Sequence, residues 1–195
     1  MLHDIIDNKN IKVACNIINK GEIIIYPTDT LYGFGVDATN TSAIIQLNNL
    51  KKREQVYSII VNSNNMLDKY ADVSKEGWDA ISKYFPGPYT MIFNRKESDL
   101  SDLISLNLKT IGVRVPKHQF PIKIVEYLDR PIVTTSVNIH NKNPLFDLEE
   151  IKNEFENINI FYDKSLNNKS LGSTIIDFSS ESKIVLRKGD GNYIA

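Results

Sequence analysis

The stretch Pro27-Thr28-Asp29-Thr30-Leu31-Tyr32-Gly33-Phe34-Gly35 carries the strongest structural signal in this chain. The apolar, β-branched run at 22–26 precedes it and predicts a buried strand, which Pro27 ends because proline cannot donate a hydrogen bond to a ladder. Small oxygen-bearing side chains and two closely spaced glycines follow this strand. Such a loop either brings donors close to a small polar ligand or forms an ordinary turn in which Asp and Thr bond their own backbone. The spacing alone leaves both interpretations open.

Helical and strand-like patterns alternate along the rest of the chain. Apolar residues at helical spacing predict helices at 11–20, 40–50, 75–85, 120–128 and 148–155. Short apolar runs predict strands at 22–26, 58–61, 90–93, 110–115, 131–136, 158–162, 174–177 and 184–187. This alternation predicts an α/β fold with a mixed sheet, because the late strands follow one another too closely for a purely parallel sheet. Since there is no internal repeat and no long linker, we expect a single domain over residues 1–195.

The composition is that of a globular protein without a strong overall charge. Of the 195 residues, 42% are hydrophobic and 24% are charged, and the formal net charge is −1, so contact with nucleic acid would need a local basic patch. The single cysteine, Cys15, excludes an intrachain disulfide and argues against a cysteine-based metal site, and we expect it to pack in the core. The N-terminus does not resemble a signal peptide and no apolar run has membrane-spanning length, which favours a cytoplasmic protein.

One arginine, Arg114, interrupts the apolar strand predicted at 110–115. Its guanidinium needs a partner there, because burying an unpaired charge is costly. The partner is either a structural carboxylate, such as an aspartate, or the carboxylate or phosphate of a bound ligand. The sequence does not decide between these two alternatives.

Other polar side chains stand at the ends of predicted strands. Thr134, Ser136 and Asn138 alternate along the end of one strand and therefore share a face. Ser173 precedes another strand, and Arg187 ends the last one. Each can be a cap, a turn residue or a surface charge, but together they suggest a concave site for an anionic ligand. The common phosphate-loop, dinucleotide-binding, zinc-protease and nucleophile-elbow motifs do not occur in the sequence.

Seven segments, taken in order, resemble the motifs of the YrdC family. They are Pro27–Gly35, Lys51–Glu54 (a K-x-R motif), Phe85–Thr90 (F-P-G-P-x-T), Gly112–Pro116 (V-R-x-P), Thr134–Asn138 (S-x-N), Gly172–Asp177 (S-T-x-x-D) and Leu186–Arg187. The resemblance covers nearly the whole chain, although only the first segment is long enough to be specific by itself.

The family consists of threonylcarbamoyl-AMP synthases, which are nucleotidyltransferases, and the resemblance implies this activity. ATP, L-threonine and bicarbonate or CO2 would give L-threonylcarbamoyladenylate and pyrophosphate, with Mg²⁺ arriving on the ATP phosphates. Other proteins would use the adenylate to modify adenosine 37 of tRNA, and tRNA itself is a further possible partner. The implied fold is a twisted mixed α/β sheet, flanked by helices, around a large basic cavity. The chain resembles the family's short, single-domain form.

The resemblance also assigns roles to individual residues. Those implied to bind L-threonine are Thr30, Arg114, Thr134 and Ser173. Those implied to bind ATP are Lys51, Arg53, Thr110, Ser136, Asn138 and Arg187. Lys51 and Arg53 are also the implied catalytic residues, and no metal-ligating residue is implied.

Among the positions where the chain departs from the family pattern, three bear on ATP contacts, and two other functions remain open. Tyr57 stands where the family often has lysine, Asn62 stands where some members have histidine, and His140 replaces a serine. These changes bear on single ATP contacts. One alternative function is a non-catalytic RNA-binding module of the same fold. The other is the carbamoyl-transfer domain of a hydrogenase-maturation protein, which a chain with one cysteine argues against because that protein adds cysteine-rich zinc segments.

Overall fold

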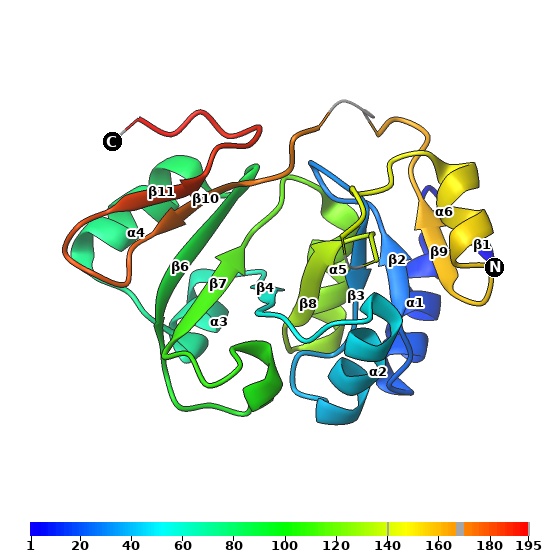
Figure 1. The fold of residues 1–195 in the computed structure, drawn as a ribbon, viewed down its shortest axis with the longest axis horizontal. Helices are drawn as coiled ribbons and strands as arrows, with labels where there is room; N and C mark the ends of the chain where they lie inside the picture. Colours follow the sequence, from blue (N-terminus) through cyan, green and yellow to red (C-terminus); the bar gives the residue numbers. More distant parts are fainter. Residues whose placement is uncertain (140, 167–169, 195) are drawn as a thin grey trace.

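The computed structural model describes residues 1–139, 141–166 and 170–194, and one mixed β-sheet runs through them (Figure 1). Its strands are β1 (Leu2–Asp4), β2 (Ile24–Tyr26), β3 (Gly33–Gly35), β4 (Ser58–Ile60), β5 (Ala71–Asp72), β6 (Tyr89–Arg95), β7 (Thr110–Arg114), β8 (Ile132–Ser136), β9 (Asn159–Tyr162), β10 (Thr174–Asp177) and β11 (Ile184–Arg187). The strand order is β1-β9-β2-β3-β8-β4-β7-β6-β10-β11, and β5 pairs with β6. Parallel pairs such as β4–β7 and antiparallel pairs such as β6–β7 both occur, which confirms the predicted mixed α/β sheet.

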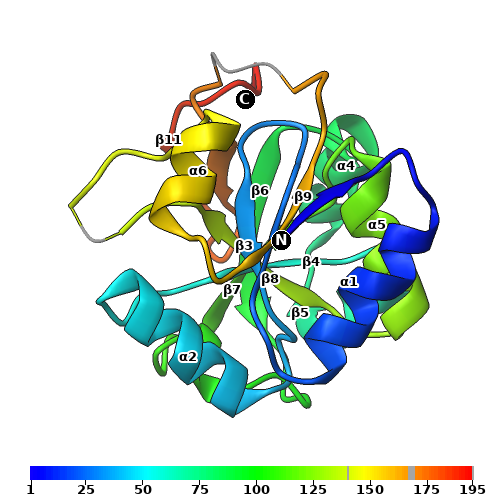
Figure 2. The same cartoon turned by 90° about the vertical axis from the view of Figure 1, so that its right-hand side faces the viewer.

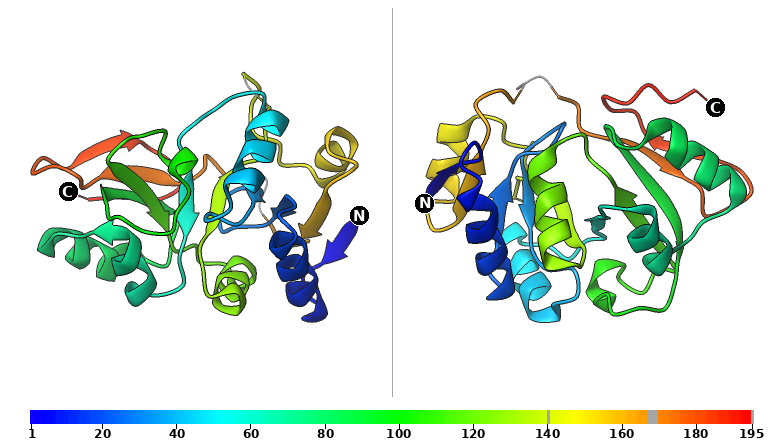
Figure 3. Two further views of the ribbon diagram at one scale, coloured as in Figure 1. Left: turned by 90° about the horizontal axis from the view of Figure 1, so that it is seen from below. Right: turned by 180° about the vertical axis from the view of Figure 1, so that it is seen from behind.

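Helices cover both faces of this sheet. They are α1 (Lys9–Asn19), α2 (Thr41–Lys51), α3 (Asn64–Tyr70), α4 (Lys75–Tyr84), α5 (Gln119–Leu128) and α6 (Leu148–Glu154), with a 3₁₀ turn at Asp102–Ile104. Figure 2 shows α1 and α5 on one side of the strands and α2 and α6 on the other. The view from behind in Figure 3 shows α1 and α5 side by side. Within the described ranges, every helix is too short or too polar to cross a membrane.

The helix ends and the core follow from the sequence. The Asn40 side chain accepts a hydrogen bond from the Ala43 amide and caps α2 as the sequence predicts, and Lys52 ends this helix in a left-handed conformation with φ of 54°. Cys15 is buried in the apolar cluster that α1 and α5 form against the sheet, together with Ile124. This position confirms the expectation that the thiol packs in the core.

The structure corrects the second half of the opening motif. Gly33-Phe34-Gly35, which the sequence assigns to a glycine-spaced loop, is the strand β3. It pairs with β2 on one side and with β8 on the other, where Gly33 lies opposite Ser136. A Cβ atom on Gly35 would lie 2.6 Å from the buried ring of Tyr26, so a side chain there would not fit. The loop proper is therefore shorter than predicted, and it is held directly against the end of β8.

Candidate active site

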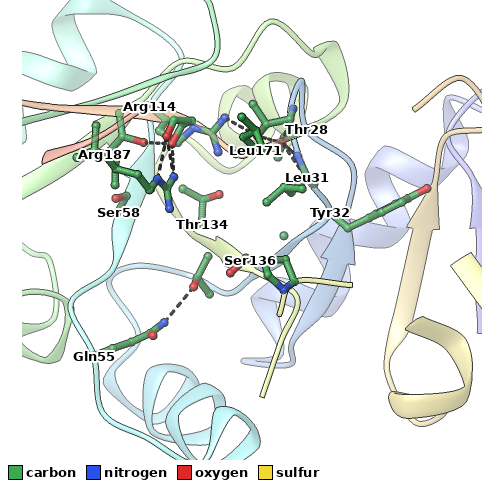
Figure 4. Close-up of a pocket in the computed structure, with 18 of the residues that line it drawn as sticks. Thr28, Leu31, Tyr32, Gln55, Ser58, Arg114, Thr134, Ser136, Leu171 and Arg187 are labelled. Atoms are coloured by element: carbon green, nitrogen blue, oxygen red, sulfur yellow. Dashed lines mark hydrogen bonds between the residues drawn. The ribbon is translucent and has the colours of Figure 1, made fainter. Parts of the chain in front are cut away.

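A cavity of about 280 Å³ lies beside the loop that joins β2 and β3 (Figure 4). Its walls come from segments that are far apart in the sequence. The lining residues are Thr28, Thr30, Leu31, Tyr32, Gly33, Arg53, Gln55, Val56, Ser58, Thr90, Arg114, Thr134, Thr135, Ser136, Pro144, Leu171, Gly172, Ser173, Ile175 and Arg187. The set includes Thr30, Arg53, Arg114, Thr134, Ser136, Ser173 and Arg187, so the fold brings these predicted site residues together.

The strand register builds the floor of the cavity. Ser58 in β4 lies opposite Gly112 of β7 and opposite Thr134 of β8. Because residues paired in register point to the same face of a sheet, Ser58 and Thr134 share the cavity face with Arg114, two residues beyond Gly112. A Cβ atom on Gly112 would lie 2.5 Å from the Ser58 hydroxyl oxygen, so the glycine makes room for this side chain.

Arg114 ends β7 and reaches the cavity from a buried strand. Its Nη2 donates to Asp29 Oδ1 at 2.9 Å and to Thr30 Oγ1 at 3.2 Å. The partner that the sequence left undecided is therefore an aspartate of the opening motif. The Nε of Arg114 is buried without a hydrogen-bond partner, which leaves the guanidinium with an unused donor.

The opening loop is both a turn and a wall of the cavity. The Thr28 hydroxyl accepts hydrogen bonds from the amides of Thr30 and Leu31 and donates to the Leu31 carbonyl at 2.7 Å. This self-bonded turn fixes the loop, as the simpler interpretation of the sequence expects. It also places the Thr30 hydroxyl 3.1 Å from the Thr28 hydroxyl and within reach of Arg114. The two interpretations of the motif are therefore compatible.

Ser173 and Arg187 form the opposite wall. The Nε and Nη2 of Arg187 donate to the Ser173 carbonyl at 3.0 and 2.8 Å, and Nη2 also donates to the Ser173 hydroxyl at 3.1 Å. The hydroxyl groups of Ser173 and Thr90 are 2.7 Å apart. Arg187 thus stands at the end of β11 with its guanidinium turned toward the cavity, as Figure 4 shows.

The electrostatics of the cavity favour an anionic ligand. Arg53, Arg114 and Arg187 line it, and no aspartate or glutamate occurs among its described lining residues. Burial, and then the nearby charge of Arg114, lower the pKa of Arg187. The Nε of Arg53 is buried without a hydrogen-bond partner. Three arginines that face one space, two of them with an unused Nε donor, are typical of a site for carboxylate or phosphate groups.

Lys51 lies in the wall behind the cavity and not in its lining. It is fully buried on the inner face of α2. Its ammonium donates to the Ser136 carbonyl at 2.7 Å, to Asn138 Oδ1 at 2.9 Å and to the Asn138 carbonyl at 3.0 Å. Burial, and then the charge of Arg53, lower its pKa to about 7. The structure shows Lys51 supporting the end of β8, and its predicted catalytic and ATP-binding roles stay predictions.

Asn138 and Thr110 are likewise outside the cavity lining. Asn138 accepts a hydrogen bond from the Ser136 hydroxyl at 2.8 Å and donates to the Lys142 carbonyl at 2.8 Å, so it shapes the turn after β8. Thr110 begins β7, opposite Asn94 and four positions before Arg114. Strand alternation puts it on the same face as Arg114, but beyond the cavity. Their predicted contacts with ATP stay predictions.

The three departures from the family pattern have different surroundings. Tyr57 points into the core, where its hydroxyl donates to Asn48 Oδ1 at 2.6 Å, and burial raises its pKa. Asn62 has a buried Oδ1 without a hydrogen-bond partner and does not line the cavity. His140 lies outside the described residues. The position of Tyr57 therefore gives this side chain a packing role, with no contact to the cavity.

Sequence reasoning missed several lining residues, among them Gln55 and Ser58. The amide of Gln55 donates to the Thr135 hydroxyl at 3.0 Å and ties the segment after α2 to β8. The signal for Ser58 was available, because it begins the strand predicted at 58–61 and is polar within an apolar run. The pairing of β4 between β7 and β8 was not visible in the sequence, and it is this pairing that brings Ser58 to the floor.

The chain matches one protein-family model over most of its length. Residues 16–189 match the model Sua5_yciO_yrdC, which carries the description "Telomere recombination". This range includes every residue that lines the cavity.

Two named proteins resemble the chain in sequence. A putative threonylcarbamoyl-AMP synthase of Methanocaldococcus jannaschii is 35% identical over 175 residues, which cover 88% of this chain and 82% of that protein. A threonylcarbamoyl-AMP synthase of Pyrococcus abyssi is 27% identical over 188 residues. This second match covers 94% of the chain but 55% of the relative, so the chain spans about half the length of that protein.

A solved structure has the same fold. It is the crystal structure of Pyrococcus abyssi Sua5 complexed with L-threonine, which matches with a TM-score of 0.90 and 26% identity. The match covers 97% of this chain and 57% of that chain. The similarity therefore extends over nearly the whole chain.

Proposed function

Because this chain belongs to the Sua5/YciO/YrdC family, we propose that it is an L-threonylcarbamoyladenylate synthase. It forms threonylcarbamoyl-AMP and pyrophosphate from L-threonine, ATP and bicarbonate or CO2. The observation that carries the proposal is the gathering of three arginines and several hydroxyl groups, all from motif segments, around a cavity without carboxylates among its described lining residues. In this proposal the product is consumed by proteins that transfer the threonylcarbamoyl group to tRNA.

L-Threonine binds between the opening loop and the end of β7. Arg114 takes its carboxylate, because a guanidinium with an unused donor matches a carboxylate in shape and charge. The hydroxyl groups of Thr30, Thr134 and Ser173 surround the rest of the amino acid. The similarity to the structure of Pyrococcus abyssi Sua5 complexed with L-threonine agrees with this choice of amino acid.

ATP binds toward Arg53, Ser136 and Arg187, all of which line the same cavity. These two arginines neutralise phosphate charges, as guanidinium groups do in many phosphate sites. Lys51 and Asn138 contribute by holding the end of β8 in place. Thr110, on the same face of β7, is available to an ATP molecule that extends beyond the cavity.

Mg²⁺ enters this proposal as part of the ATP substrate. The donor set of the cavity consists of hydroxyls, amides and guanidinium groups, and hard divalent cations prefer carboxylate and phosphate oxygens. These residues therefore suit a metal that is carried by the triphosphate. A metal held in this way supplies charge neutralisation at the phosphates.

The reaction requires little general acid–base catalysis by the protein. The amine of L-threonine adds to CO2 and loses a proton to give a carbamate, whose oxygen then attacks the α-phosphorus of ATP. The bond from this phosphorus to the bridging oxygen breaks, and pyrophosphate leaves. The protein contributes by aligning the carbamate with the phosphate and by stabilising the added negative charge with Arg53 and Arg187.

A pyrophosphate-release assay tests the proposal. The protein should release pyrophosphate only when ATP, bicarbonate and L-threonine are all present. Arg114→Gln should raise the KM for L-threonine by about tenfold or more, because a charge-assisted contact is lost.

Arg130→Gln is the matched control, because Arg130 pairs with Asp37 and does not line the cavity. It should leave the KM for L-threonine unchanged. Pyrophosphate release without L-threonine would contradict the proposal. RNA binding without any ATP binding would favour the alternative of a non-catalytic module.

A further inference from the structure

Asp29 contacts the proposed substrate arginine from outside the cavity. Its Oδ1 accepts from Arg114 Nη2 at 2.9 Å, and its Oδ2 accepts from the Lys117 amide at 2.9 Å. The side chains of Asp29 and Arg114 are each 9% exposed. Thr28 and Thr30 line the cavity, but Asp29, between them, does not. The carboxylate therefore lies behind the guanidinium and ties the opening loop to the residues after β7.

The hydrogen bonds of Arg114 divide its guanidinium into a used and an unused part. A guanidinium has five N–H donors, two of them on Nη2. Both Nη2 donors are engaged, one by Asp29 and one by the Thr30 hydroxyl. Nε is buried without a partner, and among the described residues Nη1 makes no hydrogen bond. Asp29 thus fixes the plane of the group and leaves the other donors for a ligand.

We propose that Asp29 is a positioning residue that orients Arg114 for the carboxylate of the amino-acid substrate. This inference rests on the proposed function, since it deepens the role given there to Arg114. The competing interpretation is that Asp29 occupies the place of the substrate carboxylate and must move away before L-threonine binds. The structure favours positioning, because both carboxylate oxygens are engaged within the protein and the residue is not part of the lining.

The chain contains a matched ion pair for comparison. Asp37 is buried, and its Oδ2 accepts from Arg130 Nε at 2.6 Å, while its Oδ1 accepts from the amide and the hydroxyl of Thr39. Like Asp29, it therefore joins an arginine to a backbone amide. None of these three residues lines the cavity. Breaking the Asp37–Arg130 pair therefore measures what such an interaction contributes to stability without affecting the cavity.

The test compares Asp29→Asn with Asp37→Asn in the pyrophosphate-release assay. Asp29→Asn should raise the KM for L-threonine by about tenfold, the effect of losing one charged hydrogen bond, and change the KM for ATP less than about twofold. Asp37→Asn should lower the melting temperature and leave both KM values unchanged. Asp29→Glu keeps the charge and should give a KM for L-threonine between those of the wild type and Asp29→Asn.

Each other outcome counts against the inference. An unchanged KM for L-threonine in Asp29→Asn would overturn it, and a lowered KM would show competition. If Asp29→Asn does not fold, the KM of Asp29→Glu for L-threonine decides. A KM above that of the wild type supports the inference, and an unchanged KM overturns it.

A second measurement separates this inference from the proposed function. The Nε–Hε nuclear magnetic resonance signal of Arg114 should be sharp in the wild type and broadened in Asp29→Asn, whether or not the enzyme turns over. If the wild type releases no pyrophosphate, the proposed function fails. An Arg114 signal that is the same in Asp29→Asn and in the wild type overturns the positioning role of Asp29, whatever the pyrophosphate assay shows.

Discussion

Lys51 places a buried ammonium among three oxygen acceptors, none of which is a carboxylate. The charged form has three N–H groups, which match the Ser136 carbonyl, the Asn138 carbonyl and Asn138 Oδ1. The neutral amine keeps two hydrogens and must give up one of these contacts. Burial, followed by the charge of Arg53, lowers the pKa of Lys51 to about 7, so both forms occur near neutral pH.

The lowered pKa of Lys51 predicts how stability depends on pH. Between pH 7 and 10 the unfolded chain binds the proton more fully than the folded protein, so the free energy of unfolding should rise with pH, by at most about 1.4 kcal/mol per pH unit. Below pH 7 both states carry the proton and the contribution is constant. Urea unfolding of the wild type at pH 6, 7.5 and 9 should show this rise, and Lys51→Met should lack it.

Lys52→Met is the control for this measurement, because Lys52 is the exposed neighbour at the end of α2. Its pH profile should follow that of the wild type. Parallel profiles for the wild type and Lys51→Met would show that Lys51 does not titrate in this range.

The K-x-R motif could be found in the sequence, but the direction of its side chains could not. The sequence did contain a signal, since Lys51 lies seven positions after Ile44 and therefore on the same helical face. That face is buried, which turns Lys51 inward, while Arg53 lies beyond the end of α2 and reaches the cavity. Similarly, Arg114 was known to need a partner, but its pairing with Asp29 depends on contacts between distant segments.

At the scale of elements, the C-terminal arm at residues 188–194 holds one wall of the cavity. The amide of Asp190 donates to the Gly172 carbonyl at 2.8 Å. Its carboxylate accepts from the Leu171 amide at 2.8 Å and from the Ser170 hydroxyl. Leu171 and Gly172 line the cavity, so the arm determines where this wall stands.

Asp190→Ala should therefore weaken substrate binding as well as the fold. Losing the carboxylate contacts to the amide and the hydroxyl should cost about 1–2 kcal/mol of stability and raise the KM for ATP several-fold. Asp177→Ala is the matched control, since Asp177 also accepts from a serine amide and hydroxyl, those of Ser179, but does not line the cavity. Equal KM values for ATP in Asp190→Ala and Asp177→Ala would show that the arm does not hold this wall of the cavity in place.

Element prediction succeeded where the local pattern and the tertiary context agree. The helix at 75–85 and the strand at 184–187 correspond closely to α4 and β11. The strand β3 was missed because its two glycines have low strand propensity. What stabilises it is the packing of Tyr26 over Gly35 and the pairing with β8, and neither contact is local. Helix α3 and the short strands β1 and β5 were missed as well.

At the scale of the whole molecule, the cavity couples binding to global stability. Its lining residues come from β3, β4, β6, β7, β8, β10 and β11 and from the loops beside them, so the site exists only in the folded sheet. A ligand that binds only the folded state stabilises it by about 2.7 kcal/mol at a concentration of 100 times Kd. For a chain of this size, each kcal/mol raises Tm by about 2–4 °C.

We therefore expect Mg²⁺-ATP and L-threonine together to raise the melting temperature by several degrees. Differential scanning fluorimetry should show this rise in the wild type and in Arg130→Gln, and a smaller rise in Arg114→Gln. A rise of equal size in both arginine variants would place the bound ligand away from Arg114.

The strand order also affects how the chain folds while it is being synthesised. Leu2 pairs with Ile160, and Tyr89 pairs with Thr174, so these strands lack partners until much later segments of the chain have been made. Such long-range pairing slows folding and leaves apolar strand edges uncovered until the partner strands have been made. A ligand of the cavity cannot shield the nascent chain before Arg187, which lines the cavity, has been added. Until then, ligand binding does not protect the uncovered strand edges from aggregation.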